Sequence, residues 1–146
     1  MRETLLSECI HQLCKRCALD CCILLSADGT VLAAEKMSWV PAQDVKHLGS
    51  LAGSLHVEAS SIMQEFSLIN VKEVGICLSD DFGDRTLRIY LRPVGAKAVL
   101  LNTIDYGWLE RGFYASPDLA YAMNYLDALL SGSPQERLQW PTDLPK

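Results

Sequence analysis

The stretch CCILLSADGTVLAAE, residues 21–35, decides the fold because it has the form of a complete β-hairpin. Residues 21–25 are an apolar run suited to a strand that is buried on both faces, and residues 30–34 resume the apolar pattern after Asp28 and Gly29. Asp and Gly tolerate the positive φ angles of tight turns, so this pair between two apolar runs is a strong hairpin signal. The stretch therefore predicts two adjacent antiparallel strands.

Helical patterns lie on both sides of this hairpin. An amphipathic helix is predicted over residues 3–19, with its buried face at Leu6, Ile10, Leu13 and Cys17. A longer helix is predicted over residues 42–66, where Ser38 and Pro41 supply the start signal. Its apolar seam follows alternating steps of three and four, and Leu51 and Met63 widen it; the seam consists of Val45, Leu48, Ala52, Leu55, Ala59, Ile62 and Phe66.

The second half of the chain predicts strands over residues 71–79, 85–92 and 97–104. Turn-forming segments at 80–84 and 93–96 join them, so they should form an antiparallel meander. A last helix opens at Ser116-Pro117-Asp118 and ends at Gly132, and its apolar stripe consists of Leu119, Met123, Leu126 and Leu130.

The last residues have no helical or strand period. Residues 133–146 contain three prolines, which predicts a mobile or loosely docked tail after a single domain over residues 1–132. Trp140 has two interpretations. An exposed Trp beside prolines can be a docking element for a partner, whereas a tail can also fold its one large aromatic side chain back on its own domain.

Composition and charge exclude several classes of protein. At 146 residues the chain fits one domain, and no apolar run approaches the roughly 20 residues of a membrane span. The amino terminus lacks the apolar core of a signal peptide, so a soluble cytoplasmic protein without membrane insertion is expected. The net charge of −5 and the dispersed basic residues argue against nucleic acid. Only Arg85, Arg88 and Arg92 approach a stripe, and their alternation with apolar residues is typical of the solvent face of a strand.

The six cysteines raise the question of a metal or redox site. Cys9, Cys14, Cys17, Cys21 and Cys22 gather near His11, and the Cys14-x-x-Cys17 pair is the sharpest motif. A structural zinc site needs four converging ligands, but a second such pair is missing, and adjacent strand residues point to opposite faces. Packing as small buried hydrophobes is therefore the leading interpretation, with thiol redox chemistry and metal binding as alternatives, and no cofactor is expected.

The sequence carries no signature of an active site. A nucleophilic enzyme needs a Ser or Cys beside an oriented base, whereas His47 and His56 fall on the predicted long helix among charged residues. The Gly-rich segment 49–54 lies inside the same helix and lacks the Lys of a phosphate-binding loop. Asp81-Phe82-Gly83 matches a kinase tripeptide by letters alone and is interpreted as a turn. The chain alone is therefore not expected to hydrolyse nucleotides.

The order of elements resembles the roadblock (dynein light chain) family, and most closely its bacterial MglB-like members. The residues that carry the resemblance are the hairpin ILLSADGTVLA at 23–33, the small-residue helix at 48–59 and VGICL at 74–78. The resemblance covers about residues 3–130. It implies an α+β sandwich of roadblock/profilin type, in which a five-stranded antiparallel sheet has the long helix on one face and the first and last helices on the other.

The resemblance also implies a homodimer that binds a Ras-like small GTPase, as regulator or scaffold without catalytic residues of its own, and that can promote GTP hydrolysis in trans. In this family the long helix and the third strand each pair with their twins. A strand over 71–79 with few charges and no proline would also be a hazard as a free edge, which pairing removes. The predicted dimer or partner interface consists of Leu48, Gly49, Ala52, Gly53, His56, Ser60, Met63, Glu73, Gly75 and Cys77.

Two further interpretations stay open at this level. Gly49 and Gly53 lie about one turn apart, so they either let two helices approach closely or fit against a loop of the same chain. The function could also be that of a small-ligand sensor or of a thiol redox protein. A solidly packed core favours the GTPase regulator, a pocket of several hundred Å³ the sensor, and an exposed thiol of low pKa the redox protein.

Overall fold

The computed structural model describes residues 2–26, 28–38, 40, 42–65, 73–79, 86–95, 98–104 and 117–140. Within these ranges the side chains at 44, 56, 59, 60, 62–65, 76–79, 86–88 and 104 are outside the description. The predicted turn at residues 80–84, which includes Asp81-Phe82-Gly83, lies outside the described residues, as do Phe66 and Ser116.

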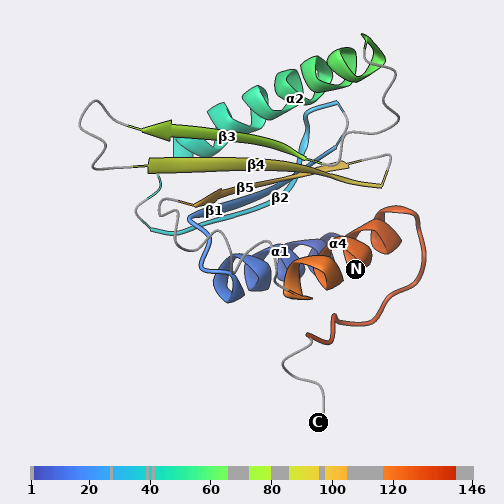
Figure 1. Ribbon diagram of the computed structural model, residues 1–146. Coiled ribbons are helices and arrows are strands. Elements are labelled where there is room, and N and C mark those ends of the chain that lie inside the picture. Colours follow the sequence, from blue (N-terminus) through green and yellow to red (C-terminus); the bar gives the residue numbers. More distant parts are fainter. Residues whose placement is uncertain are drawn as a thin grey trace.

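The described elements form an α+β sandwich around one sheet (Figure 1). In chain order they are α1 (Arg2–Arg16), β1 (Cys21–Ser26), β2 (Val31–Lys36), α2 (Ala42–Glu65), β3 (Val74–Ser79), β4 (Thr86–Val94), β5 (Ala98–Ile104) and α4 (Pro117–Leu130). The sheet has five strands in the order β2-β1-β5-β4-β3, and all its pairs are antiparallel. Helix α2 covers one face, while α1 and α4 cover the other (Figure 1), which confirms the predicted fold class.

The predicted hairpin is β1 and β2. Gly29 takes a φ of +90° in the connecting turn, the conformation that glycine tolerates best. The register shifts between Leu24, which lies opposite Ala33, and Leu25, which lies opposite Val31, so β2 contains a bulge at Leu32. The side chains of β1 from Cys21 to Leu25 are buried, as expected for a strand covered on both faces.

Several boundaries differ from the sequence prediction; β3, for example, begins at Val74 and not at residue 71. Two of the differences have a clear backbone cause. Helix α1 ends at Arg16 and not at residue 19, because Ala18 adopts a left-handed φ of 52° and the Leu19 N–H donates to the Cys14 carbonyl at 2.9 Å. No glycine marks this stop in the sequence. Strand β4 continues through Pro93 to Val94, because the positive φ of 59° that turns the chain belongs to Gly95.

The two faces of the sheet bury separate apolar clusters. On the α1 and α4 face, Cys22 and Leu24 of β1 pack with α1, α4 and Tyr90. On the α2 face, Cys21, Ile23 and Leu25 pack with Ala52 and with residues of β4 and β5. The expected opposite orientation of Cys21 and Cys22 is therefore confirmed, and each cysteine is part of a packed core.

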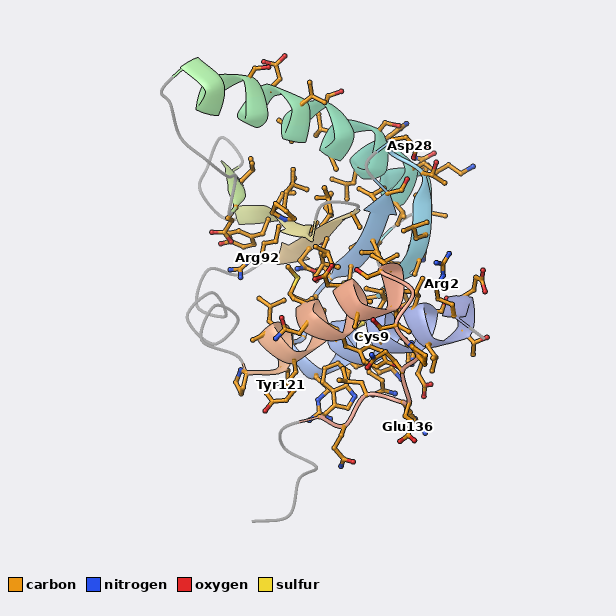
Figure 2. The ribbon with its side chains drawn as sticks, turned by 90° about the vertical axis from the view of Figure 1, so that its right-hand side faces the viewer. Arg2, Cys9, Asp28, Arg92, Tyr121 and Glu136 are labelled. Atoms are coloured by element: carbon orange, nitrogen blue, oxygen red, sulfur yellow. The ribbon has the colours of Figure 1, made fainter. Side chains whose placement is uncertain are left out.

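The described part of the tail, residues 131–140, crosses the α1 and α4 layer as a strap without helix or strand (Figures 1 and 2). The Tyr125 hydroxyl donates to the Glu136 carbonyl at 2.7 Å, and Arg137 pairs with Glu8. Trp140 is only 6% exposed, and the Arg16 guanidinium lies 4.9 Å from its ring centroid. Trp140 thus folds back on its own domain. The domain boundary at residue 132 stays a prediction.

Candidate partner-binding surface

The outward face of α2 carries exposed apolar side chains on an otherwise small and polar surface. Leu51 is 47% exposed and Val57 is 63% exposed, and Ser50, Ser54 and Ser61 beside them are also exposed. Leu51 therefore lies outside the seam that it was expected to widen. A helix that turns such residues to solvent offers a surface that burial by another protein would stabilise.

The inward face of α2 contains several residues that were predicted to meet a partner. Leu48 and Ala52 pack on the α2-side cluster of the sheet, and Ala52 is buried. A Cβ atom on Gly49 would lie 3.5 Å from Leu25 Cδ2 and 3.6 Å from Val31 Cγ2. Gly49 and Ala52 thus fit the chain's own hairpin and sheet, and their part in an interface between two helices stays a prediction. A larger side chain at Gly49 would push α2 away from the strands.

Gly53 lies one turn further along α2, where it faces the hairpin turn. A Cβ atom at Gly53 would be 4.0 Å from the Gly29 Cα, which is ordinary contact, and Gly53 is half-buried. The interpretation in which both glycines sit against a loop or strand of the same chain is therefore the one that their contacts support. The interface as a whole stays a prediction.

The other predicted interface residues are divided between α2 and β3. His56, Ser60 and Met63 are on α2. Cys77 is on β3, where it lies opposite Arg88 of β4. The side chains of these four interface residues are outside the description.

Among the described strands, β3 is an edge of the sheet, since it pairs with β4 alone. Glu73, just before β3, ties this edge to β4, because its Oε1 lies 2.9 Å from Arg92 Nη2 and accepts a hydrogen bond from Nε at 3.0 Å. The exposed Gly75 lies beside the Tyr90 ring.

The tip of the hairpin is held by a small hydrogen-bond network around Asp28. The Ser26 hydroxyl and the Thr30 N–H, at 3.0 Å, both donate to Asp28 Oδ1. These bonds stabilise the carboxylate, with Ser26 making the largest contribution, and lower the pKa of Asp28 to about 2. The turn therefore presents a fixed negative charge beside α2, as Figure 2 shows.

Two open hollows flank the place where the hairpin meets α2. One of about 510 Å³ lies between the hairpin tip and the middle of α2, and Asp28 and Glu58 give it an acidic lining. The other, of about 380 Å³, lies between β2 and the start of α2, where Lys36 and Lys46 are at its rim. The α2 side of the molecule is thus acidic at the hairpin tip, whereas two lysines and Glu35 line the hollow near the start of the helix.

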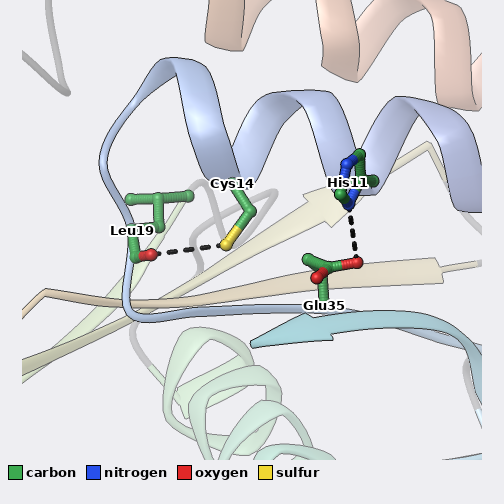
Figure 3. Close-up of polar contacts among 4 residues, drawn as sticks. All are labelled: His11, Cys14, Leu19 and Glu35. Carbon is green, nitrogen blue, oxygen red and sulfur yellow. Dashed lines mark hydrogen bonds and ion pairs between the residues drawn. The ribbon is translucent and has the colours of Figure 1, made fainter. Parts of the chain in front are cut away.

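The thiols near the amino terminus are poorly suited to redox or metal chemistry. Burial raises the pKa of Cys9 to about 12, of Cys14 to about 12 and of Cys21 to about 11. Cys14 Sγ also donates to the Leu19 carbonyl at 3.3 Å (Figure 3). The described residues contain no cluster of three or more His, Cys, Asp or Glu residues that could hold a metal ion. These cysteines are therefore packing residues, since the thiolate is the reactive and metal-binding form.

Solved structures with the same architecture identify the fold. MglB of Myxococcus xanthus matches with a TM-score of 0.71 at 14% identity, over 92% of this chain and 93% of that one. The chain has the roadblock fold. A further MglB structure, described as having a tetrameric arrangement, matches with a TM-score of 0.69 at 16% identity, over 90% of this chain and 91% of that one. A Roadblock/LC7 domain from Streptomyces avermitilis matches with a TM-score of 0.67 at 18% identity, over 86% and 97%.

Sequence comparison alone finds none of these similarities, since no protein-family profile and no curated protein matches the chain. The resemblance that was predicted from the hairpin and the order of elements is thus confirmed as a likeness of fold.

Within the roadblock fold, sequence reasoning missed the exposure of Leu51 and Val57. The available signal was that Val57 is apolar yet falls off the seam.

No helix among the described residues is long and apolar enough to cross a membrane.

Proposed function

We propose that this chain is a homodimeric roadblock-type regulator or scaffold that binds a Ras-like small GTPase in the cytoplasm and has no catalytic residues of its own. The observation that carries the proposal is a roadblock fold in which α2 exposes Leu51 and Val57 and β3 is an edge of the described sheet. Roadblock proteins, as the resemblance implies, use this helix and this strand to assemble and to hold the GTPase. A more specific version of the proposal is that the chain promotes GTP hydrolysis by the GTPase to which it is bound.

Self-association is supported by the chemistry of both surfaces. Pairing of β3 with its twin would satisfy the outward N–H and C=O groups of an edge strand that has no proline. Pairing of α2 with its twin would bury Leu51 and Val57, and the serines between them are small enough for close approach. A two-fold axis lets one patch serve both subunits.

Light scattering tests the dimer. Val57→Arg would place a charge in the proposed helix pair and should convert a dimer to a monomer at low micromolar concentration, with an unchanged circular dichroism spectrum. Tyr121→Arg is the matched control, because Tyr121 is 47% exposed on α4, in the layer on the opposite side of the sheet, and should leave the dimer intact. A Val57→Arg protein that stays dimeric would show that the dimer interface lies elsewhere on the molecule.

Capture with and without a GTP analogue tests the partner. The wild-type chain should retain a small GTPase from its source cell in a nucleotide-dependent manner, and the purified pair should then show whether phosphate release accelerates. The chain alone should release no phosphate from GTP or ATP. Turnover by the repurified chain, or retention of no GTPase in either nucleotide state, would count against the proposal.

The described structure does not favour the alternative functions. The hollows beside α2 are open to solvent and lie outside the sheet–helix core, where Ile23 and Ala52 are buried, whereas a sensor would enclose its ligand. A redox protein would need a thiol of low pKa, whereas burial raises the pKa of the Cys9 and Cys14 thiols. Maleimide labelling at pH 7.5, located by mass spectrometry, should modify the half-buried Cys17 before these two. Rapid labelling of Cys14 would revive the redox alternative.

A further inference from the structure

The outer edge of β2 and the adjacent hollow have the features of a docking site for an extended peptide. Among the described strands β2 pairs with β1 alone, so its other edge offers backbone N–H and C=O groups to an added strand. Strand β2 is the edge opposite β3 in the order of the sheet. The site therefore lies at the other edge of the sheet from the proposed β3 pairing, shares only the first turns of α2 with the proposed helix pair, and does not depend on the proposed function.

The hollow beside this edge is lined mainly by apolar atoms. Val31 and Ala34 point to the α2 face, since they lie opposite Leu25 and Ile23 of the α2-side cluster. Both are exposed, Val31 to 45%, and with Ala42 and Val45 of α2 they line the space of about 380 Å³. An added strand would direct every second side chain, about 7 Å apart, into this space.

The charges around the hollow favour an acidic occupant. Lys36 at the end of β2 and Lys46 on α2 lie at its rim. Glu35 also lines it, but its Oε2 lies 2.9 Å from His11 Nδ1 on α1, on the far side of the strand (Figure 3). On a chain with a net charge of −5, this basic rim is a local exception, and it would attract carboxylates to the strand edge.

We propose that the β2 edge binds an extended segment of a partner protein, with apolar side chains at alternate positions and acidic residues at its ends. The segment adds to the sheet as a sixth strand next to β2. Its apolar side chains fill the hollow between Val31, Ala34 and Val45, and its acidic ends pair with Lys36 and Lys46. A second copy of this chain is a poorer occupant, because β2 ends in Lys36 and its one acidic residue, Glu35, is paired with His11, so a twin strand would bring no carboxylate to the lysines.

The test uses two labelled ten-residue peptides and the full chain. Both have a core of alternating threonine and valine; one has two aspartates at each end and the other has two lysines. The aspartate peptide should bind with micromolar affinity, weaken several-fold between 0.05 and 0.3 M salt, and shift amide NMR signals of β2 and of the first turns of α2. No binding up to 1 mM, or shifts confined to β3, would overturn the proposal.

A charge exchange keeps the test valid if groove variants fold poorly. The double variant Lys36→Glu, Lys46→Glu should bind the aspartate peptide about tenfold more weakly and recover affinity for the lysine peptide. Ala34→Arg should fill the hollow and abolish binding of both peptides, whereas Tyr121→Arg should change nothing. Unchanged preference in the double variant, or concentration-dependent self-association through β2 that displaces the peptide, would refute the assignment.

Discussion

The two faces of one sheet are covered in very different ways. On the α1 and α4 face, each helix contributes several fully buried side chains, and the strap of residues 131–140 adds Trp140 above them. On the other face, Ala52 is the one described α2 side chain that belongs to the buried cluster, while Leu51 and Val57 face solvent. The difference teaches that the first face is closed by packing within the chain, whereas the second leaves apolar side chains of α2 exposed to solvent, where we propose that other proteins bind.

The largest expected effect comes from a cavity in the closed face. Ile10 on α1 has no exposed surface, so Ile10→Ala should lower the free energy of unfolding by about 3–4 kcal/mol, through lost burial and the cavity left behind. Val57→Ala on the open face should change it by less than about 0.5 kcal/mol for the monomer. Urea unfolding of dilute protein measures both, and equal losses would erase the distinction between the faces.

The strap should contribute less than the helices. Trp140→Ala should cost about 2 kcal/mol, below the roughly 3–5 kcal/mol of a Trp in a fixed core, because a segment without helix or strand bonds can detach. The unfolding midpoint in urea gives the loss, and hydrogen exchange of α1 amides should rise at the same time. If stability and exchange both stay at wild-type values, the strap is not part of the closed face.

The closed face also has a polar side chain that should destabilise it. Asn102 on β5 lies opposite Cys22 and Tyr90 and is fully buried, and its amide atoms have no hydrogen-bond partner in the described structure. Asn102→Leu should therefore raise the free energy of unfolding by about 1 kcal/mol, since an unsatisfied buried amide is costly. Thermal unfolding checks the sign. A clear loss of stability would show that the amide has a partner in solution.

The smallest effect concerns the hairpin tip on the open face. The pKa of Asp28 falls from 3.8 to about 2 in the folded chain, so its stabilising contribution is present above pH 4 and is lost as the pH falls through 2. Asp28→Asn should remove this part of the acid dependence, so the variant should be slightly less stable than the wild type above pH 4, and the difference should disappear as the pH falls through 2. Unfolding curves between pH 2 and 5 make the comparison, and identical acid profiles for the two proteins would mean that the network around Asp28 is not formed.

The order of elements and their type were predictable because each rests on local signals. The hairpin, the seam of α2 and the three later strands follow from periodicity and turn residues, and the antiparallel meander follows from short connections. The stop of α1 was not predictable, since Ala18 takes a left-handed conformation that the sequence does not mark. The sequence also could not say whether Trp140 meets its own chain, since that depends on α1 and α4 being assembled.

The candidate site, like the fold, was predictable from the sequence only in part. Sequence alone determined that α2 carries an apolar seam with small residues beside it and that the segment at 71–79 contains a strand that needs a neighbour. Only the tertiary structure decided that Gly49 and Ala52 face the chain's own sheet, that Leu51 and Val57 face outward, and that β2 and β3 are the two edges of the described sheet. The physical reason is that helical periodicity fixes which residues share a face, whereas the direction of that face is set by packing between segments far apart in the chain.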